Sequence, residues 1–154
     1  MTTTGPTPNP TRRYLDALVR RLLRSPLHGL LSGKLMVIEV VGRRSGKRYT
    51  IPVAYGEYDG DVLMGVSKAK WLRNLAPDRT VTVTVRGRRR EMYPELLTDE
   101  ESLVELYPHI VRGNRAHAKY QQLRVLPDGS VDRDDLRAAL ARGLTLVRLR
   151  PSER

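Results

Sequence analysis

Short β-prone segments separated by turn residues fill the stretch between residues 35 and 97, and this pattern constrains the fold more than any other. Gly42–Gly46 and Tyr58–Asp61 carry the Gly, Ser and Asp residues that favour tight turns. Tight turns join antiparallel neighbours, so the pattern indicates an antiparallel sheet or a small barrel rather than βαβ units. The expected strands are Leu35–Val41, Tyr49–Tyr55, Val62–Val66, Val81–Val85 and Arg89–Leu97.

Helical patterns follow these strands. Thr98 with Glu101 three residues later predicts a capping box that opens a helix through about Tyr107. Pro52 lacks a backbone N–H and indicates an edge or a bulge in the second expected strand. The remaining expected elements are one helical turn at 71–75, helices within 109–124 and over 132–142, and a last strand at Leu144–Leu149.

The N-terminal region divides into two parts. Residues 1–10 (MTTTGPTPNP) hold nothing to pack and are expected to form a flexible tail, which leaves one predicted domain over residues 11–154. Residues 11–24 place leucines at helical spacing among arginines, which predicts a basic amphipathic helix that ends before Pro26. Such a helix can cover one opening of a core, or make peripheral contact with an anionic membrane.

The net charge of +11 is unevenly distributed. Residues 34–93 carry 13 basic and 6 acidic side chains, whereas residues 94–154 carry 10 of each. A concentrated positive field attracts an anionic partner, which can be nucleic acid, an acidic membrane surface, or a phosphorylated or polycarboxylate small molecule. Charge alone does not choose among these.

Several classes of site are excluded by composition. The sequence contains no cysteine and therefore can form no disulfide, iron–sulfur cluster or cysteine-ligated zinc. His28, His109 and His117 lack metal-ligand spacing, so no protein-bound metal is expected. No apolar run approaches the ~20 residues of a membrane-spanning helix, and the N-terminus lacks the apolar core of a signal peptide. We expect a cytoplasmic protein, with membrane association left open through residues 11–24.

Two basic, hydroxyl-bearing clusters stand at strand ends. The first, Gly42–Arg48, offers Arg forks and flexible glycines in a turn, an arrangement that can hold a phosphate but also suits a solubilising hairpin. The second, Ser67-Lys68, ends the third expected strand and leads toward Trp71 and Asn74. Gly29–Lys34 resembles a phosphate loop, but it is one residue short and lacks the Ser or Thr after Lys34 that would hold magnesium.

Taken in order, the short motifs resemble the deazaflavin (coenzyme F420)-dependent nitroreductase family, the split β-barrel oxidoreductases of actinobacteria. The resemblance covers about residues 11–124. The matching residues are Gly42-Arg-Arg-Ser-Gly46, Pro52, Asp59-Gly60, Ser67-Lys68, Trp71, Asn74-Leu75, Val81–Val85, Thr98-Asp-Glu-Glu101, Pro108 and Tyr120-Gln121. The resemblance implies an α+β, mainly β fold: a split antiparallel barrel with an N-terminal amphipathic helix and helices near the C-terminus.

The resemblance also implies a chemistry and a set of site residues. The expected reaction is hydride transfer from reduced coenzyme F420 to a quinone, an enone or a nitroaromatic compound, with the cofactor carrying the chemistry. His117 and Tyr120 are expected to face the substrate, and a near-neutral pKa would suit His117 to proton donation. The expected cofactor-binding residues are Arg43, Arg44, Ser45, Gly46, Lys47, Arg48, Ser67, Lys68, Ala69, Trp71 and Asn74.

The sequence departs from the family pattern at three places. Only Ala69 and Lys70 separate Lys68 from Trp71, where the family has a longer, Gly-rich loop. Tyr49 stands where the family has a basic residue, and Arg48 beside it is a candidate substitute. Of the family's tyrosine cluster only one member remains, because the three aligned positions are Asn114, His117 and Tyr120, and Leu126 to Leu140 resembles an insertion.

Other functions remain alternatives at this stage. The short loop after Lys68 is compatible with a relative that has lost the coenzyme and binds or converts a small metabolite without it. A basic nucleic-acid-binding barrel is less favoured, because the basic stretch 86–90 is followed by a single aromatic residue, Tyr93. FMN or haem in the same barrel is a further alternative. We expect a small-molecule substrate, no nucleic acid, and either a monomer or a homodimer.

Overall fold

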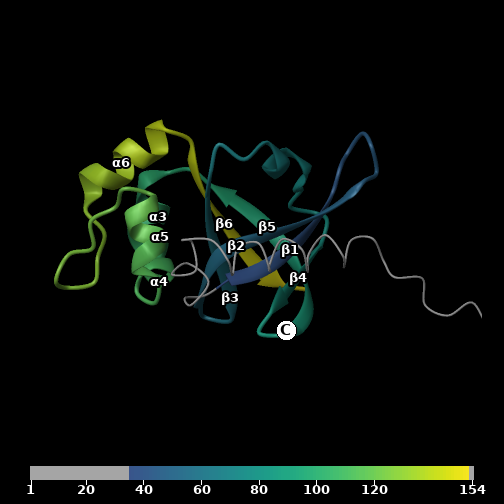
Figure 1. Cartoon of the computed structure of the whole chain (residues 1–154), viewed down its shortest axis with the longest axis horizontal. Coiled ribbons are helices and arrows are strands. Elements are labelled where there is room, and N and C mark those ends of the chain that lie inside the picture. Colours follow the sequence, from purple (N-terminus) through teal and green to yellow (C-terminus); the bar gives the residue numbers. More distant parts are fainter. Residues whose placement is uncertain (1–34, 153–154) are drawn as a thin grey trace, which may run out of the picture.

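The computed structural model describes residues 35–152, in which six antiparallel strands form a closed barrel with the order β1-β2-β3-β6-β5-β4 (Figure 1). The predicted barrel is therefore confirmed. The basic helix expected over residues 11–24, the tail and the Gly29–Lys34 segment lie outside the described residues. The strands are β1 Leu35–Val41, β2 Arg48–Tyr58, β3 Asp61–Ser67, β4 Val81–Val85, β5 Arg88–Leu97 and β6 Leu144–Pro151.

Two hairpin turns each contain a glycine at the second turn position. Asp59 and Gly60 have φ values of 52° and 81°, and Arg86 and Gly87 have values of 51° and 78°. Two successive positive φ angles are the geometry of the two-residue turn whose twist matches paired strands, and Asp-Gly is among its preferred sequences. These turns fix the pairing of β2 with β3 and of β4 with β5.

The second strand is longer than predicted, because its first part pairs with one strand and its last part pairs with another. Residues 48–54 pair with β1, and residues 55–58 pair with β3. Pro52 lies opposite Val37 in the half that pairs with β1 alone. A residue without an N–H is tolerated there because its other side faces no strand, so the expected edge position is confirmed.

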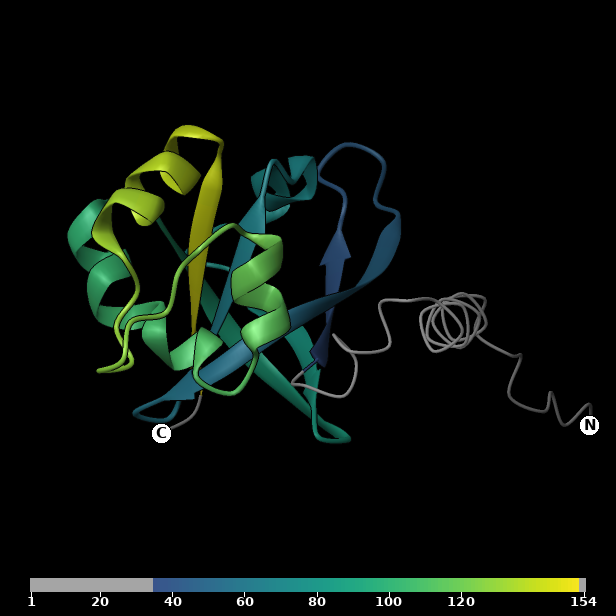
Figure 2. The same cartoon turned by 60° about the vertical axis from the view of Figure 1, so that its left-hand side comes forward.

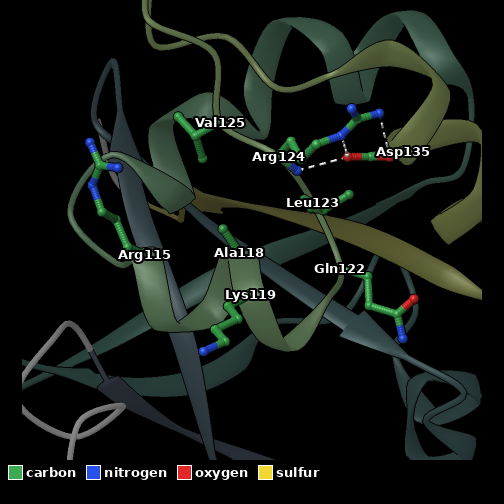
Figure 3. Close-up of a pocket in the computed structure, with 8 residues that line it drawn as sticks. All are labelled: Arg115, Ala118, Lys119, Gln122, Leu123, Arg124, Val125 and Asp135. Carbon is green, nitrogen blue, oxygen red and sulfur yellow. Dashed lines mark hydrogen bonds and ion pairs between the residues drawn. The ribbon is translucent and has the colours of Figure 1, made fainter.

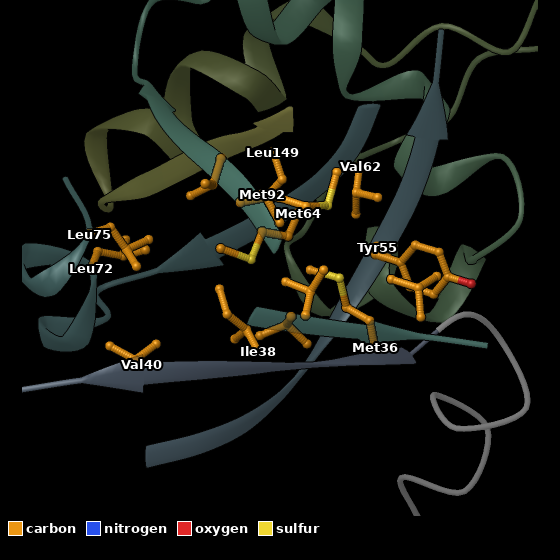
Figure 4. Close-up of a cluster of buried hydrophobic side chains, with 14 residues drawn as sticks. Met36, Ile38, Val40, Tyr55, Val62, Met64, Leu72, Leu75, Met92 and Leu149 are labelled. Carbon is orange, nitrogen blue, oxygen red and sulfur yellow. The ribbon is translucent and has the colours of Figure 1, made fainter. Parts of the chain in front are cut away.

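The barrel interior is filled by alternate residues of each strand. Met36, Met64 and Met92 are buried at its centre, and flexible thioether side chains fill a core that has no phenylalanine (Figure 4). The 3-10 helix η1, Lys70–Asn74, follows β3 and contributes Leu72 and, just after it, Leu75 to the same cluster. The helical turn expected at 71–75 is therefore present, and it packs against the barrel interior.

The helices cover the outer face of β3 and β6. Leu63 and Leu146 belong to a second apolar cluster with the helices, while Val62 and Val147 belong to the barrel interior. Both faces of these two strands are thus buried over this stretch, which explains the consecutive apolar residues Val62–Met64 and Leu146–Val147. The helices are α3 Glu100–Leu106, α4 Pro108–Val111, α5 Arg115–Tyr120 and α6 Arg133–Ala141.

The predicted capping box is wrong by one residue. Asp99, not Thr98, is the N-cap of α3, and its Oδ2 accepts a hydrogen bond of 2.9 Å from the backbone N–H of Ser102. Thr and Asp both cap helices well, so the sequence alone does not decide whether Thr98 or Asp99 is the N-cap; the tertiary structure does. Strand β5 runs to Leu97 and pairs there with Leu146, and the chain turns into the helix directly afterwards.

The helices approach the barrel closely at Gly65. A Cβ at this position would overlap the hydroxyl of Tyr107, and would lie 2.7 Å from its Cζ. The Tyr107 ring is fully buried, in the last turn between α3 and α4. Glycine at 65 therefore sets how near the α3–α4 unit lies to β3.

Gly65→Ala is expected to lower the free energy of unfolding by about 2–3 kcal/mol, because a rigid ring must move to admit the methyl group. Chemical denaturation with a fluorescence or circular dichroism readout measures this change. Ala138→Ser, on the exposed face of α6, is the control and should change stability by less than about 0.5 kcal/mol. Equal stability of Gly65→Ala and the wild-type protein would contradict this packing.

Candidate functional site

Four segments that are distant in sequence meet at one end of the barrel. They are the β1–β2 loop at residues 42–47, the exit of β3 with η1, the C-terminal end of α5, and the turn between α6 and β6. Figure 2 shows the β1–β2 loop, η1 and the α6–β6 turn at the top of the view, the end of α5 below them, and the β4–β5 turn at the bottom. The contacts described below join these segments, so we treat this end of the barrel as the candidate site.

The β1–β2 loop is held by its own backbone. The Gly42 N–H donates to the Lys47 carbonyl at 2.8 Å, and the Gly46 N–H donates to the Gly42 carbonyl at 3.0 Å. The Ser45 hydroxyl accepts from the Lys47 N–H at 3.2 Å. The N–H groups of Gly42, Gly46 and Lys47 therefore already donate hydrogen bonds within the loop, and side chains would bind an anion there. The cations of the loop, all exposed, are Arg43, Arg44, Lys47 and Arg48.

Asn74 links this loop to η1. Its Oδ1 accepts a hydrogen bond of 3.0 Å from the Arg43 N–H, and its Nδ2 donates to the Trp71 carbonyl at 3.2 Å. One side chain thus joins the two basic, hydroxyl-bearing clusters noted in the sequence. The loop and the β3 exit therefore have a fixed relative position.

The β3 exit is fixed by pairing with β6. Ser67 lies opposite Leu144 in the antiparallel ladder, which brings the next residue, Lys68, to Gly143. The Lys68 N–H donates to the Gly143 carbonyl at 3.3 Å, and Lys68 has a φ of 51°. The left-handed conformation at Lys68 turns the chain out of the strand within one residue.

The short segment after Lys68 packs tightly. Ala69 and Trp71 are partly buried against the barrel interior, and the Leu72 N–H donates to the Ala69 carbonyl at 3.2 Å. The segment therefore caps the barrel interior at the candidate site.

The charges at this end differ from those elsewhere in the described chain. Within residues 35–152, the four loop cations and Lys68 form no ion pair with a carboxylate. By contrast, the cations with carboxylate partners in the C-terminal half are Arg124, Arg133, Arg137, Arg148 and Arg150. Other cations of the described chain, Arg88 and Arg90 among them, also form no ion pair, so what distinguishes this end is that none of these five cations is paired.

His117 is buried rather than open to a substrate. Its exposed fraction is 5%, and its Nε2 lies 2.7 Å from the Tyr107 hydroxyl. Burial lowers the pKa of His117 to about 4 and raises that of Tyr107, so at neutral pH Tyr107 is protonated and donates to a neutral imidazole. The near-neutral pKa expected for His117 is therefore wrong, because a sequence does not show the depth of burial.

Tyr120, one turn further along α5, is 71% exposed. The helix ends directly after Tyr120, where the Gln121 N–H donates to the His117 carbonyl at 2.9 Å. Gln121 itself is buried, and its Oε1 accepts a hydrogen bond of 2.8 Å from the Ser67 hydroxyl. The structure thus joins α5 to the β3 exit through Gln121.

Sequence reasoning assigned no role to Gln121, Tyr107 or Gly143. Gln121 was among the residues that carry the family resemblance, and this was the one available signal. Tyr107 is placed by its contact with Gly65, and Gly143 by its hydrogen bond with Lys68. These contacts depend on helix packing and strand pairing, which the sequence does not show.

A cleft of about 490 Å³ lies beside α5, on the segment that follows it (Figure 3). None of the predicted site residues lines it. Arg124 at its edge is held by Asp135, with its Nε 2.9 Å from the Asp135 Oδ2. The lining residues are Arg115, Ala118, Lys119, Gln122, Leu123, Arg124, Val125 and Asp135.

The basic stretch 86–90 lies at the opposite end of the barrel and is partly neutralised. Arg86 lies 2.9 Å from Glu57, and Arg89 lies 3.4 Å from Glu39. In the described part of the chain, no group of His, Asp or Glu side chains is arranged to hold a metal ion. Residues 35–152 also include no helix that is long and apolar enough to span a membrane.

Comparison with known families gives one match. The family model described as F420H(2)-dependent quinone reductase matches residues 12–126. This match confirms the family resemblance drawn from the sequence, and with it the expected class of enzyme. No curated protein matches the sequence.

Solved structures share the fold. A structure described as an F420-H2-dependent reductase (FDR-A) has a TM-score of 0.54 and 19% identity, covering 75% of this chain and 93% of that chain. One described only as a domain-swapped dimer has a TM-score of 0.53 and 19% identity, covering 92% and 99%. A FAD-binding protein from Mesorhizobium loti has a TM-score of 0.51 and 15% identity, covering 84% and 91%. At such identities the similarity shows the fold alone.

The buried His117 makes stability depend on pH. Because its pKa falls from 6.5 in the unfolded chain to about 4 in the folded protein, the unfolded state binds the extra proton between these values. Stability is therefore fully present above pH 6.5 and is lost as the pH falls toward 4, by about 2 kcal/mol between pH 7 and pH 5.

Denaturant unfolding of the wild-type protein and of His117→Gln at these two pH values tests this expectation. The variant should lack the 2 kcal/mol difference, since an amide does not titrate. An identical loss in both proteins would show that other groups cause the pH dependence.

Proposed function

Because the chain belongs to the F420H2-dependent quinone reductase family, we propose that it binds coenzyme F420 at the candidate site and reduces a small electrophile of the quinone, enone or nitroaromatic type. The observation that carries this proposal is that Arg43, Arg44, Lys47, Arg48 and Lys68, at this end of the barrel, have no carboxylate partner among the described residues. Coenzyme F420 joins a deazaflavin ring to a phosphate and a glutamate tail, so it is the kind of anion that this end of the barrel attracts.

The side chains at the site fit the anionic part of the coenzyme. Arg43, Arg44 and Arg48 offer guanidinium forks that match phosphate and carboxylate oxygens, and Lys47 adds an ammonium group. Asn74 fixes the loop that carries them, so less entropy is lost when they bind. Ser45 and Gly46 shape the turn.

When bound, the reduced coenzyme supplies the hydride. The protein supplies position and exclusion of water. In this proposal Ser67, Lys68 and Ala69 would contact the deazaflavin ring, and Trp71 and Leu72 pack against the barrel interior after them. Lys68 adds a positive charge that favours electron-rich groups in its vicinity.

The proton that accompanies reduction needs a donor, and we assign this role to the exposed hydroxyl of Tyr120 or to water. His117 is unprotonated at neutral pH, since its pKa is about 4. In this proposal His117 contacts no substrate; it anchors α5 through Tyr107 and so positions Tyr120 and Gln121.

A second candidate function rests on the tight segment after Lys68. Because Ala69 and Trp71 pack against the barrel, little room is left for a loop to fold over a ring. A relative that has lost the coenzyme, or one that holds FMN, is the alternative.

The description of one similar structure as a domain-swapped dimer supports a homodimer over a monomer.

Titration of the protein into oxidised and reduced coenzyme F420, followed by deazaflavin fluorescence, tests the proposal. We expect micromolar or tighter binding that weakens with salt, because the contacts are charged. Arg44→Ala combined with Lys68→Ala should weaken binding at least tenfold, since each removes a charge-assisted contact.

Arg88→Ala is the matched control, because it removes one exposed cation at the opposite end of the barrel. It should bind as the wild-type protein does. If the folded wild-type protein binds neither form of the coenzyme, the function without F420 is favoured instead.

A further inference from the structure

The turn between α6 and β6 reaches the candidate site, although it lies outside the part of the chain that matches the family model. That match ends at residue 126, whereas β6 begins at Leu144 and lies between β3 and β5 in the barrel. The β3–β6 register brings Gly143 to Lys68. Its neighbour, Arg142, is the last residue of the α6 unit and caps that helix.

Two hydrogen bonds connect Arg142 to Ser67 through a single residue. The Arg142 Nη2 donates to the Gln121 carbonyl at 3.0 Å, and the Gln121 Oε1 accepts from the Ser67 hydroxyl at 2.8 Å. Gln121 has an exposed fraction of 7%, whereas Ser67 is half-buried and Arg142 is exposed, so both bonds are partly sheltered from water. A sheltered, directional chain of this kind fixes orientation better than an exposed one.

We propose that Arg142 is a positioning residue of the coenzyme site: it holds Gln121, and Gln121 in turn sets the direction of the Ser67 hydroxyl. This inference rests on the proposed function, since it concerns how the same site receives the coenzyme. The turn at Arg142 and Gly143, which follows α6, is then part of the binding site.

The chemistry of a hydroxyl group defines what Ser67 can bind. A serine hydroxyl has one proton and two lone pairs, and here the proton is donated to Gln121. Ser67 is left as an acceptor, so it suits an N–H of the ring or a hydroxyl of the ribityl chain and disfavours phosphate oxygens. The phosphate is left to the cations of the β1–β2 loop, Arg44 above all.

The proposal is tested by measuring coenzyme dissociation constants for Arg142→Ala, Gln121→Met, Ser67→Ala and their pairwise combinations. Each single variant should weaken binding about tenfold, the effect of one sheltered hydrogen bond. Because the three residues act in series, each pair should bind no more weakly than its weaker member, within about threefold. Thermal unfolding is measured in parallel for every variant.

Arg133→Ala is the control for charge, since it removes a cation from the start of the same helix α6, and it should bind as the wild-type protein does. If Arg142→Ala does not fold, the pair Gln121→Met and Ser67→Ala carries the test, because neither removes the Arg142 contact to the Gln121 backbone.

Pairs that weaken binding about a hundredfold would overturn the proposal, because independent contacts multiply. A loss of affinity in Arg142→Ala alone, with Ser67→Ala unaffected, would also overturn it and would assign Arg142 a purely electrostatic role. Absence of coenzyme binding by the wild-type protein is a different result, which rejects the proposed function itself.

Discussion

The antiparallel pairing of β3 with β6 is the constraint on which the rest of the site depends. Ser67 lies opposite Leu144, and this register fixes Lys68 beside Gly143. Since β6 also pairs with β5, the same strand closes the barrel and completes the site. No hairpin turn joins β3 to β6, and β6 contributes residues to both apolar clusters, so these clusters set the register. A shift of one residue would exchange the two faces.

Electrostatics distinguishes the two ends of this barrel. At the β4–β5 end, Arg86 and Arg89 have carboxylate partners. At the other end, the loop cations around Arg44 have none among the described residues, although like charges placed close together repel. This repulsion lowers the stability of the free protein. An anionic ligand would offset it by neutralising the cations. The charge distribution therefore supports a coenzyme with phosphate and carboxylate groups.

Much of the fold could be predicted from the sequence, because its turns are local. Asp59-Gly60 and Arg86-Gly87 define hairpins by residue type, and the strands beside them follow. The site could be predicted only in part. The basic loop at 42–47 and the pair Ser67-Lys68 are each made of consecutive residues, so the chemistry of each is visible in the sequence. The bond from Ser67 to Gln121 spans 54 residues, and the burial of His117 depends on a contact with Tyr107, so neither has a local signal. A resemblance to a family identified the residues, while their orientation required the structure.

The central claim is that coenzyme F420 binds at the end of the barrel formed by the β1–β2 loop, the β3 exit and the α6–β6 turn. Amide chemical-shift mapping of isotope-labelled protein during titration with the coenzyme tests it most directly, because each segment has its own signals. We predict shifts of the amides of Arg44, Ser67, Gln121 and Gly143, and none in the turn at Arg86-Gly87. Shifts confined to that opposite turn, or none at saturating coenzyme, would contradict the account.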